Sequence, residues 1–105
     1  MERLSYEFPG GNPIPTANSA VLIGVLGSGN LEVLVESASL GGACRIEIET
    51  AAFGFGRIWE AVLTDIFDQW RVGDVRISIN DAGATPAVVS LRLNQALQAF
   101  AGKKP

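Results

Sequence analysis

The sequence predicts a two-layer α+β domain, in which a mixed, mostly antiparallel β-sheet is covered on one face by two α-helices. Several short segments alternate apolar and polar residues, which is typical of half-buried strands. Two longer segments repeat apolar residues every three to four positions, which is typical of amphipathic helices. The 105 residues are enough for one hydrophobic core, so we expect residues 1–105 to form a single domain.

The first part of the chain predicts a short strand at Leu4–Phe8 and then a Pro- and Gly-rich lead-in up to residue 19. The next strand, Ala20–Leu26, is apolar on both faces, so we expect it inside the sheet with the fifth strand beside it. Gly24 interrupts this strand and indicates a bulge or the close approach of another backbone. A third strand, Leu31–Glu36, follows a four-residue turn and alternates regularly.

The remaining elements expected are strands Cys44–Thr50 and Val75–Asn80, a helix Gly56–Arg71, and a helix from Thr85 to about Ala101. We expect the second, third and fourth strands to form a meander. The helix between the fourth and fifth strands implies that these two strands run parallel. Thr85 and Pro86 favour a helix start, because threonine caps free N–H groups and proline fits the first helical position.

Periodicity also predicts which side chains form the core. Alternation places Cys44 on the inward face of its strand, so we interpret it as a buried thiol without a reactive role. We expect the helical residues Trp59, Leu63, Phe67, Leu93 and Leu97 to pack against a sheet face that carries Ile46, Ile48, Ile77 and Ile79.

The composition excludes several kinds of function. Eight basic and eleven acidic residues give a net charge of −3, which argues against nucleic-acid binding. With no histidine and one cysteine, the chain cannot form a Ser-His pair, the usual zinc site or an internal disulfide. No apolar run approaches the length of a membrane span, and the segment MERLSYEFPGG lacks the apolar core of a signal peptide. We therefore expect a cytoplasmic protein without bound metal or a membrane partner.

The turn Gly27-Ser28-Gly29-Asn30 is the most distinctive local feature. Glycines on both sides leave the Ser28 hydroxyl unshielded and allow the backbone to direct it outward. Taken alone, this is the pattern of an ordinary exposed turn serine. A phosphate-cradling loop is disfavoured, because such loops open into a helix and this one opens into a strand.

Four segments, spread over nearly the whole chain, together carry a resemblance to a known family. They are LSYEFPGG, GSGNLEVLVE, FGFGRIWEAVL and INDAGATPAVVSLRLNQA. In this order they resemble the malonate decarboxylase acyl carrier protein, also called the delta subunit. The resemblance implies that Ser28, flanked by Gly27 and Gly29, carries 2′-(5″-triphosphoribosyl)-3′-dephospho-coenzyme A through a phosphodiester.

The same resemblance implies a carrier subunit without catalytic residues of its own. Acetyl and malonyl groups would be held as thioesters on the prosthetic group. The expected partners are the acyl-carrier transferase and decarboxylase subunits of the complex, and the transferase that attaches the prosthetic group.

Two other functions are considered. One is the carrier of citrate lyase, which uses the same prosthetic group, although the segment NDAGATPAVVSLRL favours malonate decarboxylase. The other is an unmodified α+β adaptor that binds a partner through an aromatic loop. Phe53 and Phe55 lie between glycines and are candidates for such a docking patch. Asp81 could touch a ligand, but its position before a helix favours a structural role.

Overall fold

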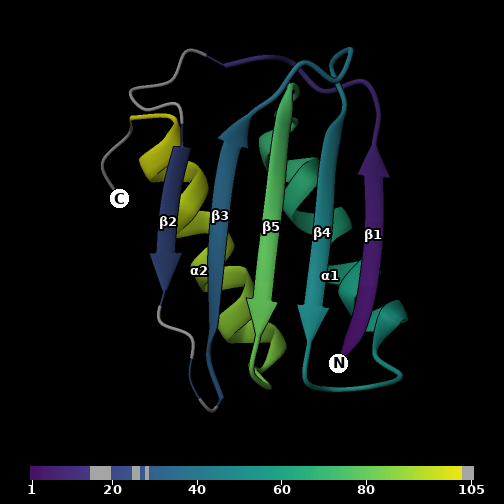
Figure 1. Cartoon of the computed structure of the whole chain (residues 1–105). Helices are drawn as coiled ribbons and strands as arrows, with labels where there is room; N and C mark the ends of the chain where they lie inside the picture. The colour runs from purple at the N-terminus through teal and green to yellow at the C-terminus, as the bar shows by residue number, and fades with distance from the viewer. Residues whose placement is uncertain (15–19, 25–26, 28, 103–105) are drawn as a thin grey trace.

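The computed structural model describes residues 1–14, 20–24, 27 and 29–102. Within them the chain forms a five-stranded sheet and two helices (Figure 1). In chain order the elements are β1 (Glu2–Phe8), β2 (Ala20–Gly24), β3 (Leu31–Ser37), β4 (Cys44–Thr50), α1 (Gly56–Trp70), β5 (Val75–Asp81) and α2 (Pro86–Phe100). No helix of the described residues is long and apolar enough to cross a membrane.

The predicted α+β class is confirmed. The strand order is β1-β4-β5-β3-β2, and β4 pairs with β5 in parallel, as the intervening helix predicts. The other three pairings, β1 with β4, β3 with β5 and β2 with β3, are antiparallel. The sheet is therefore mixed and mostly antiparallel.

The predicted placement of the second strand is wrong. β2 lies at the edge of the sheet and pairs with β3, whereas β5 lies between β3 and β4, so the three strands do not form a meander (Figure 1). An apolar run such as that of β2 predicts a strand that is covered on both faces. Leu22 instead points to the uncovered face and is 59% exposed. The predicted end of this strand, Val25 and Leu26, lies outside the described residues.

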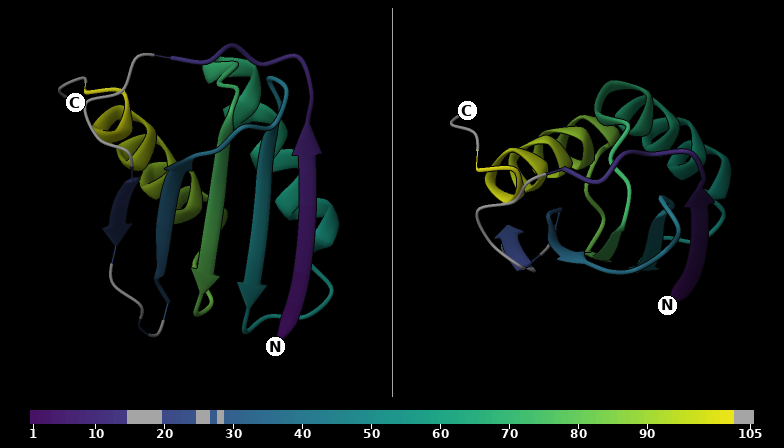
Figure 2. Two further views of the ribbon diagram at one scale, coloured as in Figure 1. Left: turned by 45° about the horizontal axis from the view of Figure 1, so that its top comes forward. Right: turned by 90° about the horizontal axis from the view of Figure 1, so that it is seen from above.

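Both helices pack on one face of the sheet, which gives the two layers seen from above in Figure 2. The core lies between the layers, and every side chain predicted for it is buried. These are Trp59, Leu63, Phe67, Leu93 and Leu97 on the helices and Ile46, Ile48, Ile77 and Ile79 on the sheet. Leu31, Val33 and Val35 of β3 lie in the same core.

The helix ends follow from local chemistry. The Thr85 hydroxyl accepts a hydrogen bond from the Val88 amide at 3.3 Å, so this residue caps α2 as predicted. Helix α1 ends one residue before the predicted boundary, because Arg71 adopts a left-handed conformation with φ of 49°. The Trp70 indole donates a hydrogen bond to Asn94 Oδ1 at 3.0 Å, which ties α1 to α2.

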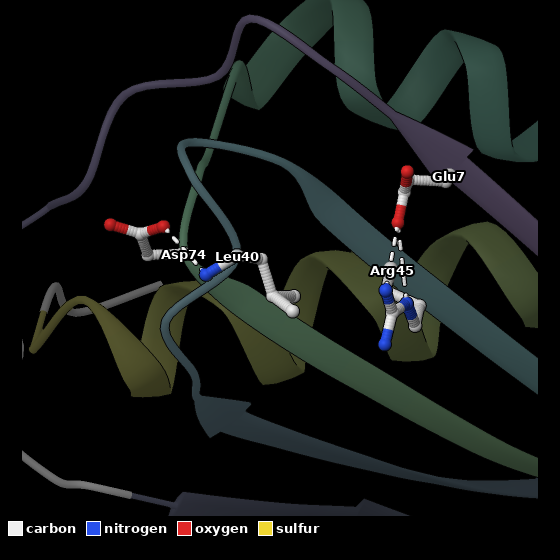
Figure 3. Close-up of polar contacts among 4 residues, drawn as sticks. All are labelled: Glu7, Leu40, Arg45 and Asp74. Atoms are coloured by element: carbon white, nitrogen blue, oxygen red, sulfur yellow. Dashed lines mark hydrogen bonds and ion pairs between the residues drawn. The ribbon is translucent and has the colours of Figure 1, made fainter.

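The sheet has two ends, which differ in how their loops are held. At one, here called the serine-loop end, β2, β4 and β5 finish and β3 begins. At the other, the closed end, Asp74 Oδ1 accepts hydrogen bonds from the Leu40 and Gly42 amides at 3.1 and 2.8 Å. Figure 3 shows Asp74 reaching Leu40 and, near it, Arg45 paired with Glu7 at 3.1 Å.

Candidate functional site

The loop between β2 and β3 carries the predicted attachment residue. Ser28 itself lies outside the described residues, so the exposure of its hydroxyl stays a prediction. The residues on both sides of it, Gly27 and Gly29, are described and exposed. The geometry of these neighbours shows how the loop is anchored.

Backbone hydrogen bonds attach the loop to the turn between β5 and α2. The Gly29 amide donates to the Ala82 carbonyl at 3.0 Å, and the Ala82 amide donates to the Asn30 carbonyl at 2.9 Å. A further bond, from the Asn30 amide to the Gly27 carbonyl at 2.9 Å, closes the turn around Ser28. The β5–α2 turn therefore holds Gly29 and Asn30, the two residues that follow the predicted attachment position.

Gly27 and Gly29 both stand clear of the rest of the described fold. A Cβ added to Gly27 or Gly29 would meet no described atom within 4 Å. Gly29 has φ of 73°, a left-handed conformation that favours glycine.

A cation lies beside this loop. Arg92 of α2 donates from Nε to Asn30 Oδ1 at 3.4 Å and from Nη1 to Gln95 Oε1 at 3.0 Å. Across residues 1–14, 20–24, 27 and 29–102 it forms no ion pair with a carboxylate. An open loop and an unneutralised guanidinium fit an attached group with a phosphodiester, since arginine matches the geometry of phosphate oxygens.

Sequence reasoning did not find Arg92. The residue lies 62 positions from Asn30, and its place on the polar side of a helix is ordinary. No signal in the sequence identifies it, because only the pairing of the serine loop with the β5–α2 turn in the fold brings the start of α2 to this end of the sheet.

Asp81 has the structural role that its sequence position favoured. The buried carboxylate accepts hydrogen bonds from the Ala84 amide at 2.9 Å and from the Thr50 hydroxyl at 2.8 Å. These two bonds join the end of β4 to the start of α2. The carboxylate thereby supports the turn that holds the serine loop.

Cys44 is a core residue, as predicted. It lies at the closed end of the sheet and is buried beside Val75, its partner in the register. Burial raises the pKa of the Cys44 thiol to about 12. The thiol is therefore protonated near neutral pH and is a poor nucleophile.

The predicted docking residues are exposed at the serine-loop end. Phe53 is 65% exposed, and Phe55 and Ile58 are also exposed. We call these three side chains the aromatic patch. Phe55 and Ile58 border a recess of about 190 Å³, whose other lining residues are Ala52, Trp59, Val62, Asp81, Gly83, Ala84, Pro86 and Val89. A docking role for the patch stays a prediction.

Comparison with known proteins decides the family. The profile described as "ACP: Malonate decarboxylase delta subunit (MdcD)" matches residues 18–100, which is most of the chain. The chain belongs to this family. This membership favours malonate decarboxylase over citrate lyase, the nearer alternative from the sequence.

Individual relatives of the delta-subunit family agree over the full length. The chain is 54% identical over 105 residues to the malonate decarboxylase acyl carrier protein of Stenotrophomonas maltophilia (strain K279a), covering 100% of this chain and 99% of that protein. It is 60% identical over 102 residues to the protein of the same name from Xanthomonas campestris pv. campestris (strain B100), covering 97% of each.

A solved structure has the same fold. It is a chain of the crystal structure of a Pseudomonas malonate decarboxylase hetero-tetramer in complex with malonate. The TM-score is 0.82 and the sequence identity 40%, with 93% of this chain and 97% of that chain covered. The two-layer architecture is therefore shared with a chain of a malonate decarboxylase hetero-tetramer.

Proposed function

We propose that this chain is the acyl carrier subunit of a malonate decarboxylase. Acetyl and malonyl groups are carried as thioesters on a coenzyme-A-derived prosthetic group, which Ser28 holds through a phosphodiester. The observation that carries the proposal is the full-length identity to proteins named malonate decarboxylase acyl carrier protein. The open, anchored loop around Ser28 supports it from geometry.

The chain contributes attachment and presentation. Attached to Ser28, 2′-(5″-triphosphoribosyl)-3′-dephospho-coenzyme A supplies the thiol on which the acyl group is carried. The hydrogen bonds that Gly29 and Asn30 form with Ala82 anchor the loop that would hold this group. A tethered acyl group reaches each partner site at a high effective concentration, because every visit is intramolecular.

The partners follow from the same role. We propose that the carrier assembles with the other subunits of malonate decarboxylase in the cytoplasm and presents acyl groups to their active sites. A separate transferase would attach the prosthetic group. Since the chain has no histidine, the base that activates the Ser28 hydroxyl is expected to come from that transferase.

Peptide mass mapping tests the attachment. Wild-type protein matured by its transferase should carry the adduct on the peptide containing Ser28, and Ser28→Ala should carry none and support no malonate decarboxylation. Unmodified wild type and Ser28→Ala should have the same unfolding midpoint, because a turn hydroxyl between glycines contributes little to packing. Ser28→Thr should be modified more slowly, because the added methyl group crowds the loop.

Ser39 provides the matched control, because it is an exposed loop serine at the closed end. Ser39→Ala should be modified at the wild-type rate. An adduct on any other residue, or malonate decarboxylation by an assembled enzyme containing Ser28→Ala, would refute the proposal.

A further inference from the structure

β1 lies at one edge of the sheet, and no strand of the described residues pairs with its outer side (Figure 1). Because β1 pairs with β4 on one side only, alternate backbone N–H and C=O groups of Glu2–Phe8 point away from the sheet. Such groups form hydrogen bonds with an extended segment. This edge can therefore accept a further strand.

The charges on β1 are arranged to favour one such strand. Charged side chains on an edge strand usually discourage pairing. Here Arg3 and Glu7 have opposite signs, are exposed, and lie two residues before and two residues after Ser5. A two-fold axis between two β1 strands at Ser5 therefore places Arg3 of each copy opposite the partner's Glu7. Unlike charges directly opposite each other stabilise an antiparallel pair.

The register between β1 and β4 extends this match. Arg3 lies opposite Glu49 and pairs with it at 3.1 Å, and Glu7 lies opposite Arg45 and pairs with it at 3.1 Å. Across two copies joined at β1, one row of side chains would be Glu49, Arg3, the partner's Glu7 and the partner's Arg45. The signs alternate along this row, and the two-fold axis repeats the row on the other side of Ser5.

The helix-covered face of the same strand is also self-complementary. Leu4, Tyr6 and Phe8 pack against the core and are only partly buried. In the register centred on Ser5, Leu4 lies opposite the partner's Tyr6, so an aliphatic side chain meets an aromatic one. Joining two copies would therefore remove from water apolar surface that a single copy leaves accessible.

Other two-fold registers match less well. Side chains keep their faces only when the pairing shifts by two residues, which moves the two-fold axis by one residue. An axis at Leu4 places Arg3 opposite the partner's Ser5, and an axis at Tyr6 places Glu7 opposite the partner's Ser5. Neither register brings unlike charges together, so the charges select the axis at Ser5.

We propose that the outer edge of β1 binds a second copy of this chain as an antiparallel β1–β1 pair centred on Ser5. The inference goes beyond the proposed function and does not depend on it. Two five-stranded sheets would become one continuous sheet. Two paired strands of seven residues bury little surface, so the dimer is weak and its population depends on protein concentration.

Sedimentation equilibrium of the unmodified protein, in a concentration series up to about 1 mM, tests dimer formation. Arg3→Glu places acidic side chains opposite each other in both rows, and Glu7→Arg places basic ones there. Each variant should raise the dimer dissociation constant roughly tenfold or more. Both positions are exposed, so urea midpoints near that of wild type should show that the variants are folded.

Arg76→Glu is the matched control. It changes the net charge by the same amount as Arg3→Glu, but Arg76 is exposed on β5, away from the edge. This variant should dimerise like the wild type. An equal loss of dimer in Arg76→Glu and Arg3→Glu would show an effect of net charge alone and would overturn the proposed register.

A mixture of Arg3→Glu with Glu7→Arg is the sharpest measurement. In a mixed pair the introduced acid faces the introduced base, and the remaining Glu7 of one copy faces the remaining Arg3 of the other. The mixed dimer should therefore form with an affinity that approaches that of the wild type, although neither variant pairs well with itself. A mixture that stays as weakly associated as its components would overturn the inference.

Hydrogen exchange of the wild type needs no substitution. Amides of β1 that point away from β4 should exchange more slowly at high than at low protein concentration, and amides of the other edge strand, β2, should not change. A protein that stays monomeric up to about 1 mM would overturn the inference. So would slower exchange of β1 only in an assembled malonate decarboxylase, because the edge would then belong to another subunit.

Discussion

The two ends of the sheet use glycine for opposite reasons. At the closed end, a Cβ on Gly73 would overlap the Gly42 carbonyl oxygen and lie 2.7 Å from the Gly11 carbonyl carbon. At the serine-loop end, a Cβ on Gly27 or Gly29 would meet no described atom within 4 Å. The closed end needs glycine because its backbones approach too closely for a side chain. At the serine-loop end, the glycines lie where there is room for one.

From this difference we expect the closed end to contribute mainly to stability and the serine-loop end mainly to function. The backbones of the closed end also bond directly, since the Gly11 amide donates to the Gly42 carbonyl at 2.9 Å and the Gly73 amide to the Asn12 carbonyl at 2.8 Å. Substitutions there should destabilise the protein. Substitutions at the tip of the serine loop should leave it folded and change only modification or partner binding.

The largest effect is expected from Gly73→Ala. Gly73 has no positive φ, so the change tests the close approach of the backbones alone. The methyl group would force the loops apart and lower the free energy of unfolding by about 3 kcal/mol. Gly27→Ala is the matched control in an open position without positive φ, and it should stay within about 0.5 kcal/mol of wild type. Equal urea midpoints for the two variants would contradict the comparison.

Asp74→Ala should have the next largest effect. It removes the acceptor of the Leu40 and Gly42 amides and places alanine at φ of 55°. We expect a loss of about 2 kcal/mol in urea unfolding, mainly from the unpaired amides. Asp74→Asn keeps an acceptor oxygen and tolerates this φ, so it should recover most of that stability. An Asn variant as unstable as the Ala variant would show that the carboxylate charge is what matters.

Cys44→Ala should cost about 1–2 kcal/mol near neutral pH, as a small truncation in a packed core. The pKa of the folded thiol is about 12, whereas an unfolded thiol ionises near pH 8.5. Between these values the unfolded state has lost the proton that the folded state keeps, so stability falls as pH rises. This contribution is complete below about pH 8.5 and is lost as pH approaches the folded pKa.

The slope of stability against pH isolates the thiol. Wild type should lose about 1.4 kcal/mol per pH unit more than Cys44→Ala in this window. Parallel stability curves for the two proteins would contradict the buried assignment. Acyl transfer by folded, matured Cys44→Ala should continue, because the proposed function assigns the acyl-carrying thiol to the prosthetic group and not to this side chain.

The smallest change in stability is expected from Phe53→Ser, because this side chain is 65% exposed. Its stability should stay within about 0.5 kcal/mol of wild type. If the aromatic patch docks on the other malonate decarboxylase subunits, their affinity should fall about fivefold or more in a titration. Leu22→Ser is the control, with 59% exposure on the uncovered sheet face, and should bind normally. Equal losses in both variants would remove the patch as a specific docking surface.

The local patterns of the sequence determined the elements and their buried faces. Alternation placed Cys44, Ile46 and Ile48 inward, and all three are buried. The helix start at Thr85 was predictable because a threonine side chain can cap free N–H groups, and Thr85 is the N-cap of α2 in the structure. These predictions succeed because the period of a strand or helix and the chemistry of a cap act over a few residues.

The tertiary structure alone decided which distant segments meet. The apolar run of β2 did not reveal that this strand lies at the edge of the sheet, because an apolar side chain reports burial only when something covers it. Likewise, nothing in the sequence around Asn30 indicates that Arg92, 62 positions away, contacts its side chain. Such neighbours depend on how the strands pair across the sheet, and pairing is settled by the packing of the whole core.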